Sequence, residues 1–180
     1  PVLLLIVGMG LYPKPFIERI DPTSKAAVES FNAANRYVKR GLSIVPTKYG
    51  INFGLKWMNQ GGCLVQVYVD GTVLITHGGV EMGQGLYVKM VQVASQMLGV
   101  PVDMVHCEET ATDKVPNQMP TAASASTDIY GAALVKACAE LNKRLEPYKE
   151  DGKPWADVVR TAHFDRVNLS AQGFYIAEKA

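Results

Sequence analysis

The chain has 180 residues, of which 48% are hydrophobic and 19% charged, a composition that excludes disorder and supplies enough apolar surface for one domain or two small lobes. Its 18 lysines and arginines nearly balance 17 aspartates and glutamates, so no basic surface favours nucleic acid or an anionic membrane. The three cysteines and three histidines are scattered, without the spacing of a zinc or iron–sulfur site, and free thiols are typical of a reducing compartment.

The chain opens with an apolar run over residues 2–7. This run is too short to cross a bilayer and lacks the basic flank of a secretory signal. It predicts either a buried strand or the cut edge of a larger protein. The chain does not begin with methionine and ends without a recognisable tail, so we expect truncation at both ends.

Three prolines within residues 11–23 predict a connector. Ser24 is a candidate cap for a helix that runs to about Arg40. We therefore divide the chain into an N-terminal segment and connector, residues 1–26, and a domain, residues 27–180.

The β-branched and apolar stretches 64–69 and 73–76 flank Asp70-Gly71. This pattern predicts a β-hairpin with a two-residue loop. A glycine-rich turn, residues 78–85, follows the second strand directly.

A helix is predicted to start at Leu86 and to stop at Gly99 and Pro101. Its expected buried stripe comprises Leu86, Met90, Val93 and Met97. Residues 102–108 predict a short strand, and residues 109–121 a loop.

Ser126 is a candidate cap for a long helix to Leu145. The expected buried stripe of that helix comprises Tyr130, Leu134, Ala137, Leu141 and Leu145. A further helix is predicted over residues 155–163, and a last strand from residues 167–169. The predicted fold class is α+β, with helices packed on small mixed or antiparallel sheets.

Three segments carry candidate chemistry. The glycine-rich turn lets backbone approach a ligand, and the N–H groups at the start of the next helix favour an anion. On spacing alone, a tight turn without a ligand is the leading interpretation, because neither GxGxxG nor a P-loop lysine is present. Gln84 favours a ligand instead, because an amide side chain between two glycines can donate and accept hydrogen bonds to a bound group at once.

The second segment, residues 120–126, is built of small residues, and helix capping by its serines is the leading interpretation. In the third segment, Phe53 is followed by Gly54, which leaves one face of the phenyl ring open. The Phe53 ring could therefore stack on a planar substrate, or it could pack in the hydrophobic core. Glu81, Glu108 and Glu109 are weak candidates for a general base.

Taken together, these segments resemble the xanthine dehydrogenase/aldehyde oxidase family of molybdenum hydroxylases. The resemblance covers residues 28–176 and rests on motifs in the same order and spacing. The motifs are Lys39 to Ile51, Thr76 to Ser95, Glu109 to Asn117, Pro120 to Ser124, Lys143 to Pro147 and Leu169 to Tyr175. The chain is thereby identified as part of a molybdopterin-binding domain.

The resemblance implies roles for particular residues. Gly83, Gln84 and Gly85 would contact the molybdopterin cofactor, together with Ala122, Ala123 and Ser124. The Ala123 backbone would pass close to the metal. Phe53 would stack on the substrate, and Gly54 replaces a threonine of typical xanthine dehydrogenases, which puts substrate identity in doubt. Phe53 and the Ala122-Ala123 pair favour the xanthine branch over the aldehyde oxidase branch, where glycine pairs are typical.

The implied activity is hydroxylation of purines such as hypoxanthine and xanthine with oxygen derived from water. The aldehyde oxidase type, or a truncated module without activity, is the alternative. The catalytic glutamate would lie beyond Ala180 and the substrate-binding arginine before the matched region, so this segment would hold no catalytic residue and be inactive alone. The complete enzyme would carry FAD and two [2Fe–2S] clusters, pass electrons to NAD or oxygen, form a homodimer, and reside in the cytoplasm or peroxisome.

Overall fold

The computed structural model describes residues 14–34, 37–44, 46 and 50–177. The chain divides into two compact units. The first unit ends at Gly50, and the second begins at Ile51. The strand predicted near the start of the chain lies outside the described residues. Residues 45 and 47–49 of the Lys39 to Ile51 motif also lie outside the described residues.

The first unit contains helix α2, Lys14–Ala34. The predicted connector is therefore wrong over residues 14–23, which are helical and include Pro22. The helix ends at Ala34 rather than near Arg40. Arg40 instead lies alongside it, because the Asn32 side chain accepts the Arg40 N–H at 2.9 Å and donates to the Arg40 carbonyl at 3.1 Å. The proposed boundary at residue 26 stays a prediction.

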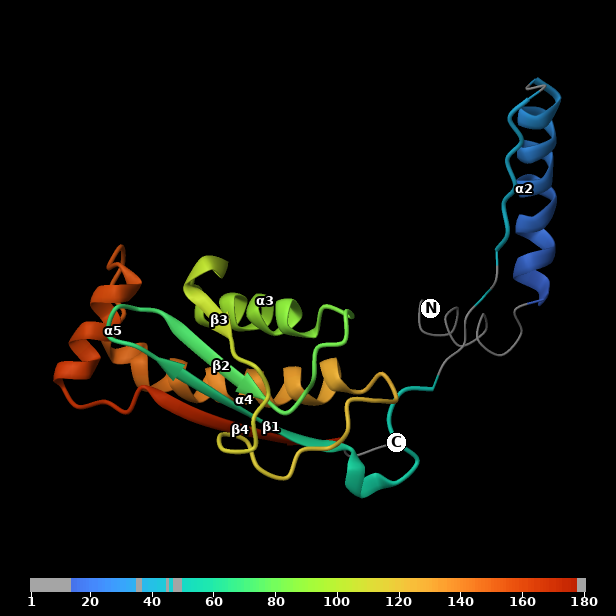
Figure 1. The fold of residues 1–180 in the computed structure, drawn as a ribbon. Helices are drawn as coiled ribbons and strands as arrows, with labels where there is room; N and C mark the ends of the chain where they lie inside the picture. The colour runs from blue at the N-terminus through green and yellow to red at the C-terminus, as the bar shows by residue number, and fades with distance from the viewer. Residues whose placement is uncertain (1–13, 35–36, 45, 47–49, 178–180) are drawn as a thin grey trace. The chain divides into compact units, whose positions relative to one another are not determined.

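The second unit is built on a four-stranded mixed sheet of order β3-β2-β1-β4 (Figure 1). The strands are β1 (Gln60–Val67), β2 (Val73–His77), β3 (Val105–Cys107) and β4 (Ser170–Ile176). Strand β1 is antiparallel to β2 and β4, whereas β2 and β3 are parallel. Helices pack on this sheet, and the α+β fold class is confirmed.

The predicted hairpin is confirmed, but its loop has three residues rather than two. The Tyr68 N–H donates to the Thr72 carbonyl at 2.8 Å, which leaves residues 69–71 as the loop. Gly71 takes the left-handed conformation, φ +91°, that closes such a loop. The hairpin end is held by Trp155, whose indole N–H donates to the Gly71 carbonyl at 2.8 Å.

Three helices and three short 3₁₀ turns complete the unit. The helices are α3 (Leu86–Leu98), α4 (Ser126–Leu145) and α5 (Trp155–Phe164). The 3₁₀ turns are η1 (Lys56–Met58), η2 (Val102–Met104) and η3 (Glu146–Tyr148). Because η2 takes its first three residues, the strand predicted over residues 102–108 shortens to β3. The last strand begins at Ser170, just after its predicted start.

Helix α4 runs along β4 and β1 and packs against both strands (Figure 1). The stripe predicted for it is confirmed, since all five of its residues are buried. The stripe of α3 is rotated from the prediction: Leu86, Met90, Ala94 and Leu98 are buried, while Val93 and Met97 are only half-buried. None of the helices in the described residues is both long and apolar enough to cross a membrane.

Glycines set the distance between α4 and the sheet. A Cβ at Gly173 of β4 would lie 1.9 Å from the Ala133 carbonyl oxygen of α4 and 2.9 Å from the Ala137 nitrogen. These are backbone atoms, so rotation of a side chain cannot relieve the clash.

We therefore expect Gly173→Ala to lower the free energy of unfolding by about 3 kcal/mol or more, because strand and helix must separate. Denaturant unfolding followed by circular dichroism measures this change. Gly131→Ala is the matched control. Its Cβ would meet nothing closer than Met90 Cε at 3.7 Å, and alanine within a helix should stabilise by up to about 1 kcal/mol. Equal effects of the two substitutions would contradict the packing described here.

Candidate functional site

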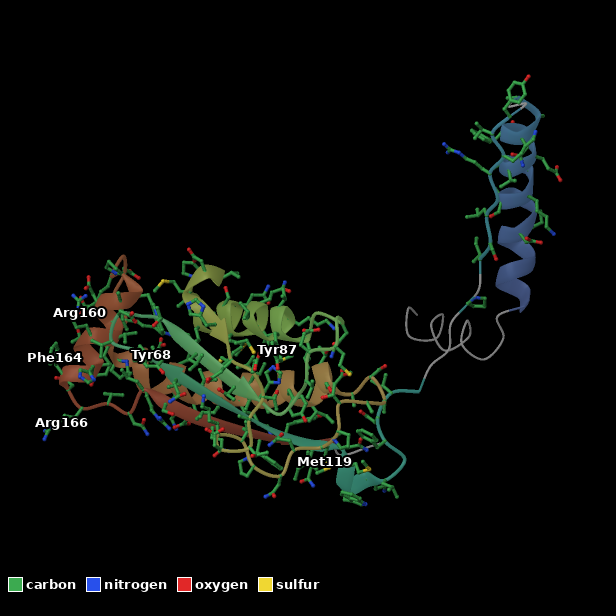
Figure 2. The ribbon with its side chains drawn as sticks, in the orientation of Figure 1. Tyr68, Tyr87, Met119, Arg160, Phe164 and Arg166 are labelled. Atoms are coloured by element: carbon green, nitrogen blue, oxygen red, sulfur yellow. The ribbon has the colours of Figure 1, made fainter. Side chains whose placement is uncertain are left out.

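The glycine-rich turn, the small-residue segment and the Phe53 loop meet at one end of the second unit. The Val80 N–H donates to the Thr121 hydroxyl at 2.8 Å, which joins the first two. The Asn52 N–H donates to the Ala123 carbonyl at 3.1 Å, which joins the second and third. This end of the sheet lies near Met119 and away from α5, whose Phe164 is labelled in Figure 2. The fold thus brings together all three candidate segments.

The glycines of the turn fall into two groups. Gly78 and Gly79 are buried packing positions, where a Cβ would lie 2.1 Å from Gln118 Cγ and 2.5 Å from Leu86 Cδ2, respectively. Gly83 and Gly85 have left-handed backbones, φ +97° and +75°, and no atom lies within 4 Å of their Cβ positions. Only this second pair leaves open space for a ligand.

Backbone N–H groups of the glycine-rich turn bond to a carboxylate within the turn itself. Glu81 Oε1 accepts the N–H groups of Gly83 and Gly85 at 2.9 Å each, and its Oε2 accepts the Tyr87 N–H at 3.1 Å. These backbone hydrogen bonds, that from Tyr87 first, lower the pKa of Glu81. Glu81 thus accepts backbone N–H groups at the start of α3, the kind of groups that can favour an anion at a helix N-terminus.

Gln84 is exposed, and its amide closes the same turn. Nε2 donates to the Val80 carbonyl at 2.9 Å, and Oε1 accepts the Met82 N–H at 2.6 Å. The side chain therefore uses one donor and one acceptor inside the turn, while its second N–H and second lone pair remain for another group.

Ala123 and Ser124 form a strained turn before α4. Both have left-handed backbones, φ +53° and +52°, and the Ala125 N–H donates across them to the Ala122 carbonyl at 3.3 Å. Left-handed residues other than glycine cost about 1 kcal/mol each and gather at functional sites. The expected cap at Ser126 is wrong, because Ala125 holds the cap position and no side chain bonds there.

Buried Asn59 fixes the backbone of the Phe53 loop. Its Oδ1 accepts the Phe53 N–H and its Nδ2 donates to the Phe53 carbonyl, both at 2.8 Å. Phe53 is half-buried and Gly54 is exposed. Asn52, the residue bonded to Ala123, also has a left-handed backbone, φ +80°.

A buried neutral histidine, His77, holds the start of the glycine-rich turn. His77 Nδ1 accepts the Gly79 N–H at 3.0 Å, and Nε2 lies 3.5 Å from Cys107 Sγ. Burial lowers the pKa of His77 from 6.5 to about 4. The Tyr87 ring meets the His77 ring edge-on at a centroid distance of 5.3 Å, and Tyr87 lies at the start of α3 in Figure 2.

The remaining candidates for catalysis do not converge. Glu108 is ion-paired with Lys114, and Glu109 is exposed. Burial raises the pKa of the Cys107 and Cys138 thiols to about 12, which leaves them protonated. Within the part of the chain that the structure describes, no group of three or more histidine, cysteine or acidic residues could hold a metal ion.

Sequence reasoning missed Asn52 and Thr121, which join the segments. It also missed Asn59 and His77, each of which holds one segment in place. Asn52 offered one signal, because asparagine is the residue other than glycine that most readily adopts a left-handed backbone in a loop. The partners of Asn59 and Thr121 were not visible, since a polar residue in a loop does not reveal which distant backbone group it will bond.

Comparisons with known proteins agree with this fold. The family model of the molybdopterin cofactor-binding domain matches residues 17–180. Xanthine dehydrogenase/oxidase of Mus musculus is 55% identical over 153 residues, which are 84% of this chain and 12% of that protein. Xanthine dehydrogenase of Oryza sativa subsp. japonica is 54% identical over 155 residues, which are 85% of this chain and 11% of that protein.

A solved structure shares the fold at low sequence identity. Quinoline 2-oxidoreductase from Pseudomonas putida 86 superposes with a TM-score of 0.63 and 19% identity, over 73% of this chain and 22% of that one. The chain belongs to the molybdopterin cofactor-binding domains of the xanthine dehydrogenase family. It spans little more than a tenth of the length of the two xanthine dehydrogenases.

The buried His77 should make stability depend on pH. Because its folded-state pKa is lowered from 6.5 to about 4, its stabilising contribution is complete above pH 6.5 and is lost as the pH falls toward 4. Between pH 7 and pH 4 we expect a loss of about 3 kcal/mol in the free energy of unfolding from this group. His77→Asn keeps an acceptor for the Gly79 N–H but does not titrate. Denaturant unfolding at both pH values should therefore show a correspondingly smaller loss in the variant, and identical pH profiles would refute the assignment.

Proposed function

We propose that this chain is a portion of a molybdenum-cofactor oxidoreductase that hydroxylates purines, and that its three joined segments contact the molybdopterin cofactor and the substrate. The hydrogen bond from the Asn52 N–H to the Ala123 carbonyl carries the proposal. It holds Phe53, the substrate-stacking candidate, one residue from a backbone contact with Ala123, the candidate nearest the metal.

The described residues fit such a cofactor. The open sides of Gly83 and Gly85 leave space for close approach of a ligand, and Ala122 and Ser124 are exposed. Gln84 retains one free donor. Backbone, amide and hydroxyl groups suit an organic cofactor that itself holds the metal.

The bound cofactor would supply the redox chemistry, hydroxylation with oxygen derived from water. The residues of this chain would position it. Glu81 keeps the turn that carries Gln84 in one conformation, and the buried amide of Asn59 does the same for Phe53. Binding groups held by supporting hydrogen bonds in this way lose little freedom when a ligand arrives.

The purine substrate is proposed because both xanthine dehydrogenases are more than 50% identical to this chain. An aldehyde substrate is the alternative. FAD, two [2Fe–2S] clusters, the catalytic glutamate and the electron acceptor, NAD or oxygen, would belong to other parts of a complete homodimeric enzyme in the cytoplasm or peroxisome.

Gln84→Ala in the complete enzyme should lower molybdenum content or turnover about tenfold, a size expected for loss of one hydrogen bond to a buried ligand. Elemental analysis and steady-state kinetics with xanthine measure the two effects. Gln92→Ala is the matched control, because Gln92 is exposed on α3 outside the three segments. Normal molybdenum content and turnover in Gln84→Ala would refute the role of Gln84.

Phe53→Ala in the complete enzyme should raise the KM for flat heterocycles about tenfold while changing kcat less, because stacking acts on binding. Phe164→Ala is the matched control, since Phe164 is 74% exposed on α5. An unchanged KM in Phe53→Ala, with the fold intact, would mean that Phe53 is only core packing.

A further inference from the structure

Asn59 is a polar residue buried in the second unit, with only 1% of its surface exposed. Its backbone is held from two sides: its N–H donates to the Lys56 carbonyl at 3.0 Å, and its carbonyl accepts the Ala177 N–H at 2.9 Å. Because Asn59 lies directly before β1, these bonds fix it to the end of the sheet. A buried carboxamide costs free energy unless its polar atoms are hydrogen-bonded. The partners of this side chain therefore indicate what its burial serves.

Both polar atoms of the Asn59 side chain bond to the backbone of Phe53. Oδ1 accepts the Phe53 N–H and Nδ2 donates to the Phe53 carbonyl, each at 2.8 Å. The two peptide planes on either side of the Phe53 Cα are thereby held, so the direction of its Cα–Cβ bond is fixed. Only rotation of the side chain remains. The neighbouring Asn52 N–H bonds to the Ala123 carbonyl at 3.1 Å, which ties the same stretch of backbone to the turn before α4.

Packing contributes little to the position of this loop. Gly54 is exposed, and no atom lies within 4 Å of the position that its Cβ would take. Leu55 and Trp57 are 57% and 61% exposed. Phe53 is half-buried, and among the described residues the apolar side chains that pack on the hydrophobic core do not include it. The direction of the Phe53 side chain is thus set by hydrogen bonds to its backbone rather than by contacts of its ring with the core.

We propose that Asn59 is a positioning residue of the substrate site, whose carboxamide holds the Phe53 backbone so that the phenyl ring presents a face to a flat heterocycle. This inference rests on the proposed stacking role of Phe53. Asn59 does not itself contact the substrate, because it is buried and both of its polar atoms bond to Phe53. A ring carried on a fixed backbone loses less freedom when it stacks, so Asn59 acts on substrate binding more than on the chemical step.

Asn59→Leu in the complete enzyme should raise the KM for xanthine about tenfold while changing kcat less, because the ring is present but no longer held. Asn142→Leu is the matched control. Its side chain also bonds at both polar atoms, to the Met97 carbonyl at 2.6 Å and the Lys149 ammonium at 3.2 Å, but it lies on α4 outside the three segments. Steady-state kinetics measure both constants, and circular dichroism checks the fold. A raised KM in Phe53→Ala beside an unchanged KM in Asn59→Leu would overturn the inference alone.

A double substitution separates positioning from a merely structural role. In the Phe53→Ala enzyme there is no ring to hold, so adding Asn59→Leu should change the KM less than about twofold. Effects of the two substitutions that multiply would overturn the inference, because Asn59 would then act on binding by another route. An unchanged KM in Phe53→Ala itself would overturn both the inference and the proposed stacking.

Asn59→Asp provides the same test with a smaller change in structure, should the leucine variant not fold. Aspartate keeps the acceptor for the Phe53 N–H, but its ionised form has no donor for the Phe53 carbonyl, whereas the protonated carboxyl has one. Burial favours the protonated form as the pH falls. We therefore expect the KM for xanthine, relative to that of the unsubstituted enzyme, to be raised at about pH 8 and to return toward one at about pH 6. A ratio of one at pH 8, or the same raised ratio at both pH values, would overturn the inference.

Discussion

The close approach of α4 to β4 is the constraint on which the rest of the second unit depends. Gly173 allows the Ala133 carbonyl to sit against the strand, so the buried stripe of α4 covers β1 and β4 without a gap. The start of the helix is thereby fixed over one end of the sheet. The Ala122–Ser124 turn precedes it, and the turn after β2 bonds to the same segment through Thr121.

The turns at this end are held mainly by their own polar groups. Glu81 satisfies three backbone N–H groups, and Gln84 satisfies one carbonyl and one N–H. Such bonds are local and form whenever the turn forms. Among the described residues, Asn52 Oδ1 and Thr76 Oγ1 are buried without a hydrogen-bond partner. The turns are thus largely ordered by their own hydrogen bonds before any ligand binds.

The sequence predicted the elements whose signal is local. The buried residues of α4 recur at helical spacing, and Asp70-Gly71 marks the hairpin, so both were found. The prediction of a connector was wrong over residues 14–23. Pro15 lies in the first turn of α2, where its missing N–H costs nothing, whereas Pro22 is accommodated inside the helix. The sequence pattern did not reveal that Glu81 accepts the backbone N–H groups at the start of α3. The motif resemblance identified the candidate segments, whereas the hydrogen bonds between them required the fold.

The left-handed Ala123 and Ser124 have a consequence for binding entropy. Glycine would adopt this turn with less strain, but it would also sample many other conformations. Alanine and serine make the turn less stable and much stiffer, because each Cβ removes most of the alternatives. A ligand that meets the Ala123 backbone therefore finds it already ordered, and the loss of chain entropy that would oppose binding has occurred during folding.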